Sequence, residues 1–288
     1  MIKAHKFTPA ELSRFRELQH ASFEILETAA AGLTGGETEQ ALARELVARY
    51  REIGATSFFH LPVVLFGDRT ALPGKWPVGK FFPRRRSLDS GDSVILDAAP
   101  IIGGYLVDTS YSFCFGENAA HAEMMSHLAQ YRASVPVAIN RGDTFSSVAD
   151  SVRASIEAAG YEAVHGKHPG QVLGHRTVKL PNLPFRLRYR GFDALALSWF
   201  SAKDALAMSG AGRRSPLWNT RTASDHAAHD GLWLVEPHAG CGAVGAKWEE
   251  ILVIEGGQAA WLDEQPPHVR QWSAIDKGAS YGPFCGGC

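Results

Sequence analysis

Two stretches of the sequence share one helix design at a fixed separation. Thr38 precedes an amphipathic segment that stops at Gly54, and Thr144 precedes a similar segment that stops at Gly160. Each of these positions in the second stretch lies 106 residues after its counterpart in the first. The helix predicted over about 9–31 also repeats, with apolar positions at Leu18, Ile25 and Ala29 matching Met124, Tyr131 and Val135. A shared cap, apolar face and stop glycine indicate an internal duplication, so we expect two related halves.

A short apolar hairpin is predicted in the first half, within residues 96–113. A two-residue loop at Ile102 and Gly103 places Asp97 directly opposite Asp108, with Cβ atoms about 5 Å apart. Two carboxylates at that distance among apolar neighbours repel each other. A shared proton, basic side chains or a bound divalent cation would offset the repulsion. The alternative is an exposed hairpin in which both aspartates are solvated.

The second half contains a matching hairpin within residues 232–257. A loop at Gly242 and Ala243 sets Glu236 opposite Glu249, between strands rich in Leu, Val, Trp and Ile. Four carboxylates that converge from two halves need more positive charge than one divalent ion supplies, which favours two ions. Oxygen-rich ligation with one imidazole suits Mn, Co, Fe or Zn. The candidate imidazoles are His165, His168 and His175.

Composition excludes several classes of partner. The 288 residues carry 29 Lys and Arg against 30 Asp and Glu, so there is no basic excess of the kind that nucleic acids select. The first twenty residues lack an apolar stretch of signal-peptide length, and no run approaches the roughly 20 apolar residues that span a bilayer. We therefore expect a cytoplasmic protein that binds neither nucleic acid nor membrane.

Two segments fall outside the repeat. We expect one catalytic domain at 1–262 with an insertion at about 183–230, where poor periodicity and many aromatic residues predict a cap that shapes a pocket or a subunit contact. A homodimer is one use of such a surface. Residues 263–288 are expected to form a tail that ends in a C-x-x-C pair, Cys285 and Cys288, which could bind a soft metal or form a disulfide.

The hairpin motifs resemble those of the pita-bread fold metallopeptidases, which include methionine aminopeptidase, aminopeptidase P, prolidase and the non-peptidase creatinase. The stretch "GDSVILDAAPIIGGYLVDTSYSF" is similar to the first metal motif of that family, and "EP" and "GAKWEE" in the second half are similar to its later motifs. The resemblance covers roughly residues 6–258. It implies an α+β pita-bread fold, in which two pseudo-symmetric halves form a curved antiparallel sheet covered by helices.

The resemblance also implies a dinuclear centre with two divalent ions, of Mn, Fe, Co or Zn. Asp97 would bind one ion, Asp108 and Glu249 would bridge both, and Glu236 would bind the second. The family's histidine motif is met in part by "GKHPGQVLGH". It makes His168 the imidazole ligand and leaves His175, seven residues later, facing the substrate; exchange of those two roles is the alternative.

Three side chains are expected to take part in catalysis. Glu236 would pass on the proton of an attacking water, and His175 would steady the oxyanion or the substrate carbonyl. His238 shares the strand face of Glu236 and could supply a further polar contact; otherwise it is a surface histidine at a strand end.

The sequence departs from the family pattern at several positions. Gly74 stands where family peptidases have an entrance histidine, and Lys247 replaces the customary arginine. His60 could reach into the site from earlier in the chain, but a lone histidine beside apolar residues is more often structural, so we interpret it as structural. The expected function is dinuclear metal-dependent hydrolysis of a peptide or amide bond in a small amino-acid-derived substrate. The alternatives are a dinuclear iron or manganese oxidase or oxygenase of a biosynthetic pathway, and a metal-free binding scaffold.

Overall fold

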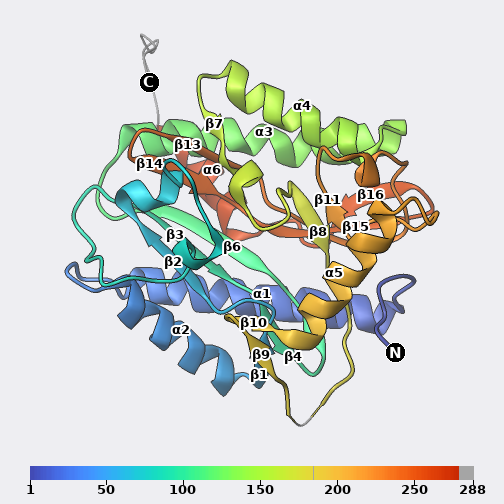
Figure 1. Cartoon of the computed structure of the whole chain (residues 1–288). Coiled ribbons are helices and arrows are strands. Elements are labelled where there is room, and N and C mark those ends of the chain that lie inside the picture. Colours follow the sequence, from blue (N-terminus) through green and yellow to red (C-terminus); the bar gives the residue numbers. More distant parts are fainter. Residues whose placement is uncertain (184, 279–288) are drawn as a thin grey trace.

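The computed structural model describes residues 1–183 and 185–278 (Figure 1). Its α-helices are α1 (Pro9–Ala31), α2 (Glu39–Glu52), α3 (Ala119–Arg141), α4 (Phe145–Ala158), α5 (Ala194–Met208) and α6 (Pro267–Gly278). Its strands in the first half are β1 (Ala55–Phe58), β2 (Val63–Phe66), β3 (Ser93–Ala98), β4 (Pro100–Ile102), β5 (Tyr105–Leu106) and β6 (Thr109–Cys114). Those in the second half are β7 (Glu162–Ala163), β8 (Gly174–Arg176), β9 (Arg188–Tyr189), β10 (Phe192–Asp193), β11 (Leu217–Trp218), β12 (Gly231–Val235), β13 (His238–Cys241), β14 (Val244–Lys247), β15 (Glu250–Glu255) and β16 (Gln258–Trp261).

The repeated helices begin at the caps that the sequence predicts. The predicted first helix is confirmed as α1, and the two repeated stretches form α2 and α4. The Thr38 side chain accepts a hydrogen bond from the backbone N–H of Ala41, and the Thr144 side chain accepts one from that of Ser147. Each threonine therefore satisfies a donor that the first helical turn leaves without an internal partner.

Helices cover the strands from two sides. Figure 1 shows α1 and α2 along one side of the strands and α3 and α4 along the opposite side. Phe15 and Leu46 from the first pair belong to one buried hydrophobic cluster, whereas Leu128 and Val148 from the second pair belong to another. The second cluster lies wholly within the second half, whereas the first also includes second-half residues such as Leu234 and Ile251.

Two antiparallel sheets carry the predicted carboxylates. In the first half β3 lies between β2 and β6, and in the second half β12 lies between β8 and β15 in a sheet that β11 and β16 extend. An isolated β-bridge joins Ser110 of β6 to Glu249, between β14 and β15. The two halves therefore meet at the residues expected to form the site.

The first carboxylate hairpin has a different register from the predicted one. Its turn is formed by Gly103 and Gly104, which both have positive φ, and Asp97 lies opposite Ser110 rather than Asp108. A two-residue hairpin turn of this kind needs positive φ at both central residues, which Gly-Gly supplies and Ile102 does not. The predicted loop at Ile102 and Gly103 was wrong by one residue.

The second hairpin has the predicted register. His238 pairs with Lys247 and Cys241 pairs with Val244, so the turn is at Gly242 and Ala243 as expected. The same register continues into β12 and β15, where Val235 pairs with Glu250. Glu236 and Glu249 therefore occupy facing positions between these two paired segments.

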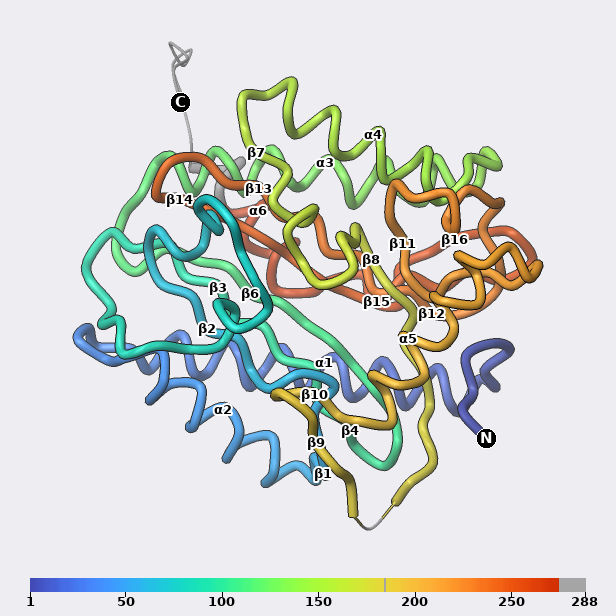
Figure 2. Tube along the Cα trace, in the orientation of Figure 1, coloured from blue at the N-terminus to red at the C-terminus, as the bar shows by residue number. Residues whose placement is uncertain are grey.

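The insertion at about 183–230 contains the hairpin β9–β10 and helix α5. The N–H of Leu61 donates to the carbonyl of Gly191, and the N–H of Asp193 donates to the carbonyl of Phe59, each over 2.9 Å. The hairpin thus lies against the chain between β1 and β2. Figure 2 shows α5 (gold) beside β8, where the ring centroids of Phe200 and His175 are 5.6 Å apart.

The segment expected as a tail begins with helix α6. Its Trp272 is buried, with its ring centroid 6.0 Å from that of Trp248. Cys285 and Cys288 lie outside the described residues. Among the described residues, no helix is long and apolar enough to cross a membrane.

Candidate metal centre

The four predicted carboxylates come together and are buried. Asp97 lies on β3, Asp108 just before β6, Glu236 just after β12, and Glu249 between β14 and β15. None of the four exposes more than 7% of its surface. The alternative of two solvated aspartates is therefore wrong. Four acidic groups in this setting need nearby positive charge.

Lys247 supplies one positive charge at the centre of the cluster. Its Nζ lies 2.6 Å from Asp97 Oδ2, 2.9 Å from Glu236 Oε2 and 2.9 Å from Glu249 Oε2. Burial alone would lower the pKa of Lys247, but attraction to these carboxylates raises it well above its usual value. The ammonium group therefore stays charged and holds one oxygen of each of these three carboxylates.

The remaining oxygens form two groups of potential metal ligands that share Asp108. In the first group, His60 Nε2 lies 3.3 Å from Asp108 Oδ2 and 3.6 Å from Asp97 Oδ1. In the second, His175 Nε2 lies 3.6 Å from Asp108 Oδ2 and 3.8 Å from Glu249 Oε1. Within each group the ligand atoms lie within 4.8 Å of one another.

These groups fit divalent metal ions. Four buried oxygens of these carboxylates accept no hydrogen bond from any described residue: Asp97 Oδ1, Asp108 Oδ1 and both oxygens of Glu249, of which Oε2 is in an ion pair with Lys247. Burial, with repulsion from Asp108, raises the pKa of Glu249 well above its usual value. Burial opposes a charge on His60, yet Asp108 and Asp97 raise its pKa to about 9. The pocket thus attracts cations, and its carboxylate and imidazole donors suit Mn, Fe, Co or Zn.

The imidazole in the Asp108–Glu249 group is His175, not the expected His168. The backbone explains this placement, because β8 pairs with β12 and puts His175 opposite Leu234, close to the end of the strand that leads to Glu236. Gly174 permits this pairing, since a Cβ there would collide with the carbonyl oxygen of Leu234. A Gly-His pair within the apolar stretch "QVLGHRTV" was the available sequence signal.

His168 instead begins a chain of hydrogen bonds that leads away from the ligand groups. Its Nδ1 lies 2.8 Å from Glu236 Oε2, and its Nε2 lies 2.9 Å from Nδ1 of His238. Nε2 of His238 lies 2.7 Å from the carbonyl oxygen of Thr70. The predicted grouping of Glu236 with His238 is therefore present, and both are buried rather than at the surface. Glu236 is not a member of either ligand group.

The Thr70 carbonyl at the end of this series of hydrogen bonds determines which histidine nitrogens carry protons. A carbonyl only accepts, so Nε2 of His238 donates to Thr70. Burial lowers the pKa of His238 well below its usual value, so its ring is neutral and Nδ1 accepts from His168. His168 thus carries one proton on Nε2. Its Nδ1 can form a hydrogen bond with the Glu236 carboxylate only if a second proton lies between these two atoms. One proton is therefore shared between His168 and Glu236.

His60 lies with Asp97 and Asp108, although the sequence favoured a structural role for it. It was interpreted as structural because it stands alone beside apolar residues. In the structure it enters the centre from the segment between β1 and β2. The family's entrance histidine would instead lie at the position of Gly74, after β2. No local motif marks His60, because its position depends on contacts with Ala99, which lies between β3 and β4, and with the distant hairpin β9–β10.

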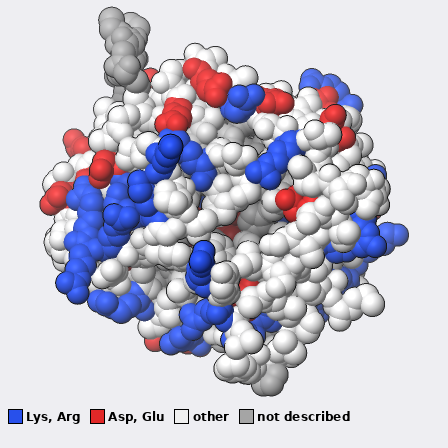
Figure 3. Space-filling model, viewed as in Figure 1, with Lys and Arg blue, Asp and Glu red and all other residues white. Residues whose placement is uncertain are grey.

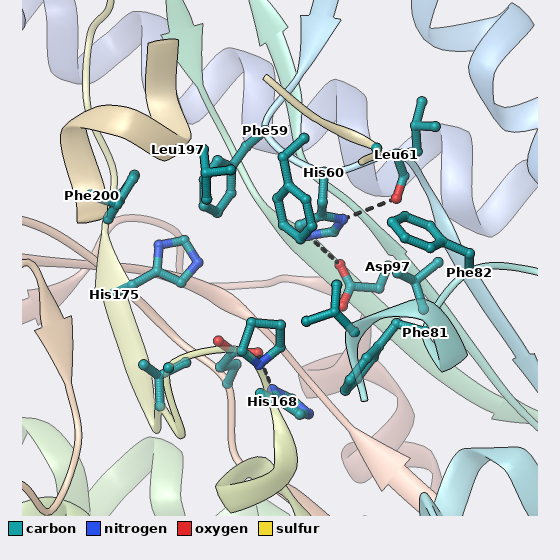
Figure 4. Close-up of a pocket in the computed structure, with 18 of the residues that line it drawn as sticks. Phe59, His60, Leu61, Phe81, Phe82, Asp97, His168, His175, Leu197 and Phe200 are labelled. Atoms are coloured by element: carbon teal, nitrogen blue, oxygen red, sulfur yellow. Dashed lines mark hydrogen bonds and ion pairs between the residues drawn. The ribbon is translucent and has the colours of Figure 1, made fainter. Parts of the chain in front are cut away.

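A largely apolar cavity opens onto these groups. Its volume is about 890 Å³. Figure 3 shows this face of the molecule hollowed at its centre, and Figure 4 shows aromatic side chains around His60, Asp97, His168 and His175. The aromatic lining consists of Phe59, Phe81, Phe82, Tyr189, Phe192 and Phe200. Tyr189, Phe192 and Phe200 come from the insertion, as expected of a segment that shapes a pocket.

Comparisons with known proteins agree with the fold. The family model described as metallopeptidase family M24 matches residues 13–191. An uncharacterized peptidase of Staphylococcus aureus (strain MSSA476) is 25% identical over 166 residues, which cover 57% of this chain and 44% of that relative. The chain therefore spans less than half the length of this curated relative.

Solved structures extend the similarity over most of the chain. The Xaa-Pro dipeptidase of Bacillus anthracis has a TM-score of 0.64 at 20% identity and covers 92% of this chain and 63% of its own. A prolidase of Pyrococcus horikoshii OT3 has a TM-score of 0.65 at 16% identity, and the similarity covers 91% of this chain and 64% of the prolidase chain. An aminopeptidase P of Escherichia coli in complex with substrate has a TM-score of 0.61 at 14% identity. The similarity covers 96% of this chain and 61% of the aminopeptidase chain. These likenesses confirm the expected α+β pita-bread fold.

Proposed function

Because this chain belongs to metallopeptidase family M24, we propose that it is a divalent-metal-dependent hydrolase of a peptide or amide bond. The substrate would be a short peptide or another small amino-acid derivative. The observation that carries this proposal is the set of buried carboxylate oxygens without hydrogen-bond donors on Asp97, Asp108 and Glu249. Asp97 lines the apolar cavity. Such oxygens are costly unless a cation binds them.

We propose two ion positions that share Asp108, as the two ligand groups suggest. Asp97 would serve the first position, and His175 with Glu249 would serve the second. This assignment exchanges the roles expected for His168 and His175. A bound Mn, Fe, Co or Zn ion would activate a water and polarise the substrate carbonyl.

His168 and Glu236 are the proposed groups that move protons. Although burial opposes it, Lys247 and His168 lower the pKa of Glu236 well below its usual value, so the carboxylate is ionised and can accept a proton. His168 lies 2.8 Å away and is fixed by His238 and the Thr70 carbonyl. Glu236 would take a proton from the attacking water, and the proton already shared with His168 would pass to the leaving amine, so that the pair ends with the protons it began with.

The cavity supports a substrate with a bulky apolar side chain. Phe59 and Phe200 have ring centroids 5.0 Å apart, and Phe200 also contacts His175. An aromatic or large aliphatic side chain placed there would be desolvated close to the proposed centre. Polar groups of the substrate backbone would then face His168 and Glu236.

The test uses the full chain, stripped with a chelator and reloaded separately with Mn²⁺, Fe²⁺, Co²⁺ or Zn²⁺. Each form is incubated with a panel of dipeptides, tripeptides and acylated amino-acid amides, and newly formed amino groups are quantified. We expect metal-dependent release, and no release by Asp108→Asn. Metal-dependent oxygen uptake without release would instead support an oxidase. Failure to bind any metal would support a binding scaffold.

A further inference from the structure

We propose that His60 is a metal ligand, so that each of the two ligand groups around Asp108 contains one imidazole. This inference rests on the proposed function, because it concerns the metal centre of the proposed hydrolase. The sequence motifs assign only one imidazole to that centre. His60 would therefore give this chain a ligand that comes from the segment between β1 and β2.

The first observation is the orientation of the His60 ring. Its Nδ1 lies 3.1 Å from the carbonyl oxygen of Leu61, which can only accept a hydrogen bond. Nδ1 therefore carries a proton and Nε2 faces Asp97 and Asp108, so that the neutral ring would offer the Nε2 lone pair to an ion bound there. Metal-binding histidines are commonly fixed in this way, with the second ring nitrogen donating to a carbonyl.

The second observation is that His175 has the same arrangement. Its Nδ1 lies 3.0 Å from the carbonyl oxygen of Arg176. Each histidine thus bonds the carbonyl of the residue that follows it, and each directs Nε2 towards Oδ2 of Asp108. The two rings approach Asp108 from different halves of the chain. If one of them is a ligand, the other is equally well oriented to be one.

The third observation concerns distances. Nε2 of His60 lies 3.3 Å from Asp108 Oδ2 and 3.6 Å from Asp97 Oδ1. Charge-assisted hydrogen bonds are shorter, at about 2.7–2.9 Å, and Lys247 reaches Asp97 at 2.6 Å in the same site. Two ligand atoms at about 2.0–2.2 Å from a common ion lie about 3.0–3.6 Å apart. The His60 contacts have the spacing of ligands rather than of a direct ion pair.

The insertion holds His60 in this position. The backbone N–H of Phe59 donates to the carbonyl of Ala99 over 2.8 Å, and that of Leu61 donates to the carbonyl of Gly191 over 2.9 Å. The Phe192 ring packs edge-on against the imidazole, with ring centroids 6.3 Å apart. His60 is thus fixed on both sides by backbone bonds, one of them from the insertion. Figure 4 shows its ring directed towards Asp97.

The competing explanation is that His60 is an imidazolium that only neutralises Asp97 and Asp108. The two explanations differ in whether a nitrogen of His60 contacts the ion. Pulsed EPR of protein loaded with Mn²⁺ alone detects imidazole nitrogens bound to the ion, and equilibrium dialysis gives the Mn²⁺ affinity. Both readouts are independent of activity.

The variants are His60→Ala, His175→Ala and the double variant, made in the full chain. His121→Gln is the control, because His121 is a buried histidine on α3 outside both ligand groups. We expect nitrogen coupling to persist in each single variant, to vanish in the double variant and to be unchanged in the control. We also expect His60→Ala to weaken Mn²⁺ binding by at least about tenfold. Circular dichroism checks the fold, and His60→Gln replaces His60→Ala if the alanine variant loses its native spectrum.

Loss of all nitrogen coupling in folded His175→Ala would overturn the assignment of His60. Unchanged Mn²⁺ affinity in the folded His60 variant would overturn it as well. Either result, with Mn²⁺ still bound by the unmodified chain, leaves the proposed function intact. If the unmodified chain binds no Mn²⁺, Fe²⁺, Co²⁺ or Zn²⁺, the proposed function and this inference fail together.

Discussion

Lys247 Nζ lies 2.6 Å from Asp97 Oδ2 and so joins β14 of the second half to β3 of the first. The same ammonium group pairs with Glu236 and Glu249. It therefore takes one oxygen from each of three carboxylates, and Asp97 Oδ1 and Glu249 Oε1 stay free to bind an ion. Lys247 thus reduces repulsion among the carboxylates and leaves their other oxygens as the proposed metal ligands.

Removal of this charge should destabilise the metal-free protein. Lys247→Met leaves three buried carboxylates without their shared cation, and breaking a buried pair typically costs about 3–5 kcal/mol. We expect a lower free energy of unfolding by that amount in chelator, measured by urea denaturation, and partial recovery with Mn²⁺. Lys247→Arg keeps the charge and is the control. Equal midpoints for Lys247→Met and the unmodified chain in chelator would contradict the structural role.

The two histidines of the predicted motif should respond differently to substitution. His175→Gln removes a proposed ligand and should lower metal content, measured by elemental analysis after dialysis. His168→Gln removes the partner of Glu236 and should leave metal content unchanged while kcat falls about 100-fold, as expected for loss of a general acid or base. Metal loss in His168→Gln with normal content in His175→Gln would restore the assignment that the sequence motif implies.

Phe200 should set the preference for apolar substrates. It lies on α5 and lines the cavity beside His175 and Phe59. Phe200→Ala removes apolar surface worth about 1.5–3 kcal/mol of burial. We expect KM for substrates with aromatic side chains to rise by at least about tenfold, and KM for alanine-containing substrates to change little. Exposed Leu206 on the same helix supplies the control Leu206→Ala; equal effects of both variants would show that Phe200 does not contact substrate.

Acid should destabilise the protein through buried neutral histidines. Burial lowers the pKa of His121 from 6.5 to about 4, and its Nε2 has no hydrogen-bond partner among the described residues. The unfolded chain binds a proton between pH 6.5 and 4 that the folded chain does not. This contribution to stability is therefore fully present above pH 6.5 and is lost as the pH falls towards 4.

The loss from His121 alone amounts to about 3 kcal/mol, because one pKa unit corresponds to about 1.4 kcal/mol. His121→Gln should flatten the curve of unfolding free energy against pH in this window. Part of the slope should remain, since burial also lowers the pKa of His165 to about 4. An unchanged slope in His121→Gln would show that His121 is already protonated in the folded state or neutralised by another group.

The sequence determined helices α1 to α4 and one of the two hairpins, but not helices α5 and α6, which lie in the segments expected to be an insertion and a tail. Thr38 and Thr144 mark helix starts because a threonine cap and a periodic apolar face act within a few residues along the chain. The Gly242–Ala243 turn was predicted correctly because a hairpin turn is also specified by residues that are close together in the sequence. The Gly103–Gly104 turn was equally local, but the choice between neighbouring loop positions depended on which residues tolerate positive φ.

The convergence of the carboxylates was also foreseeable, because the duplication places equivalent hairpins in two halves that must share one core. The identities of the histidines around them were not. His60 and His175 face Asp108 only because β8 pairs with β12 and the insertion hairpin bonds to the backbone around His60. Lys247 likewise reaches Asp97 across 150 positions of the chain. Such contacts depend on how distant segments pack, and local periodicity and motif spacing carry no information about that packing.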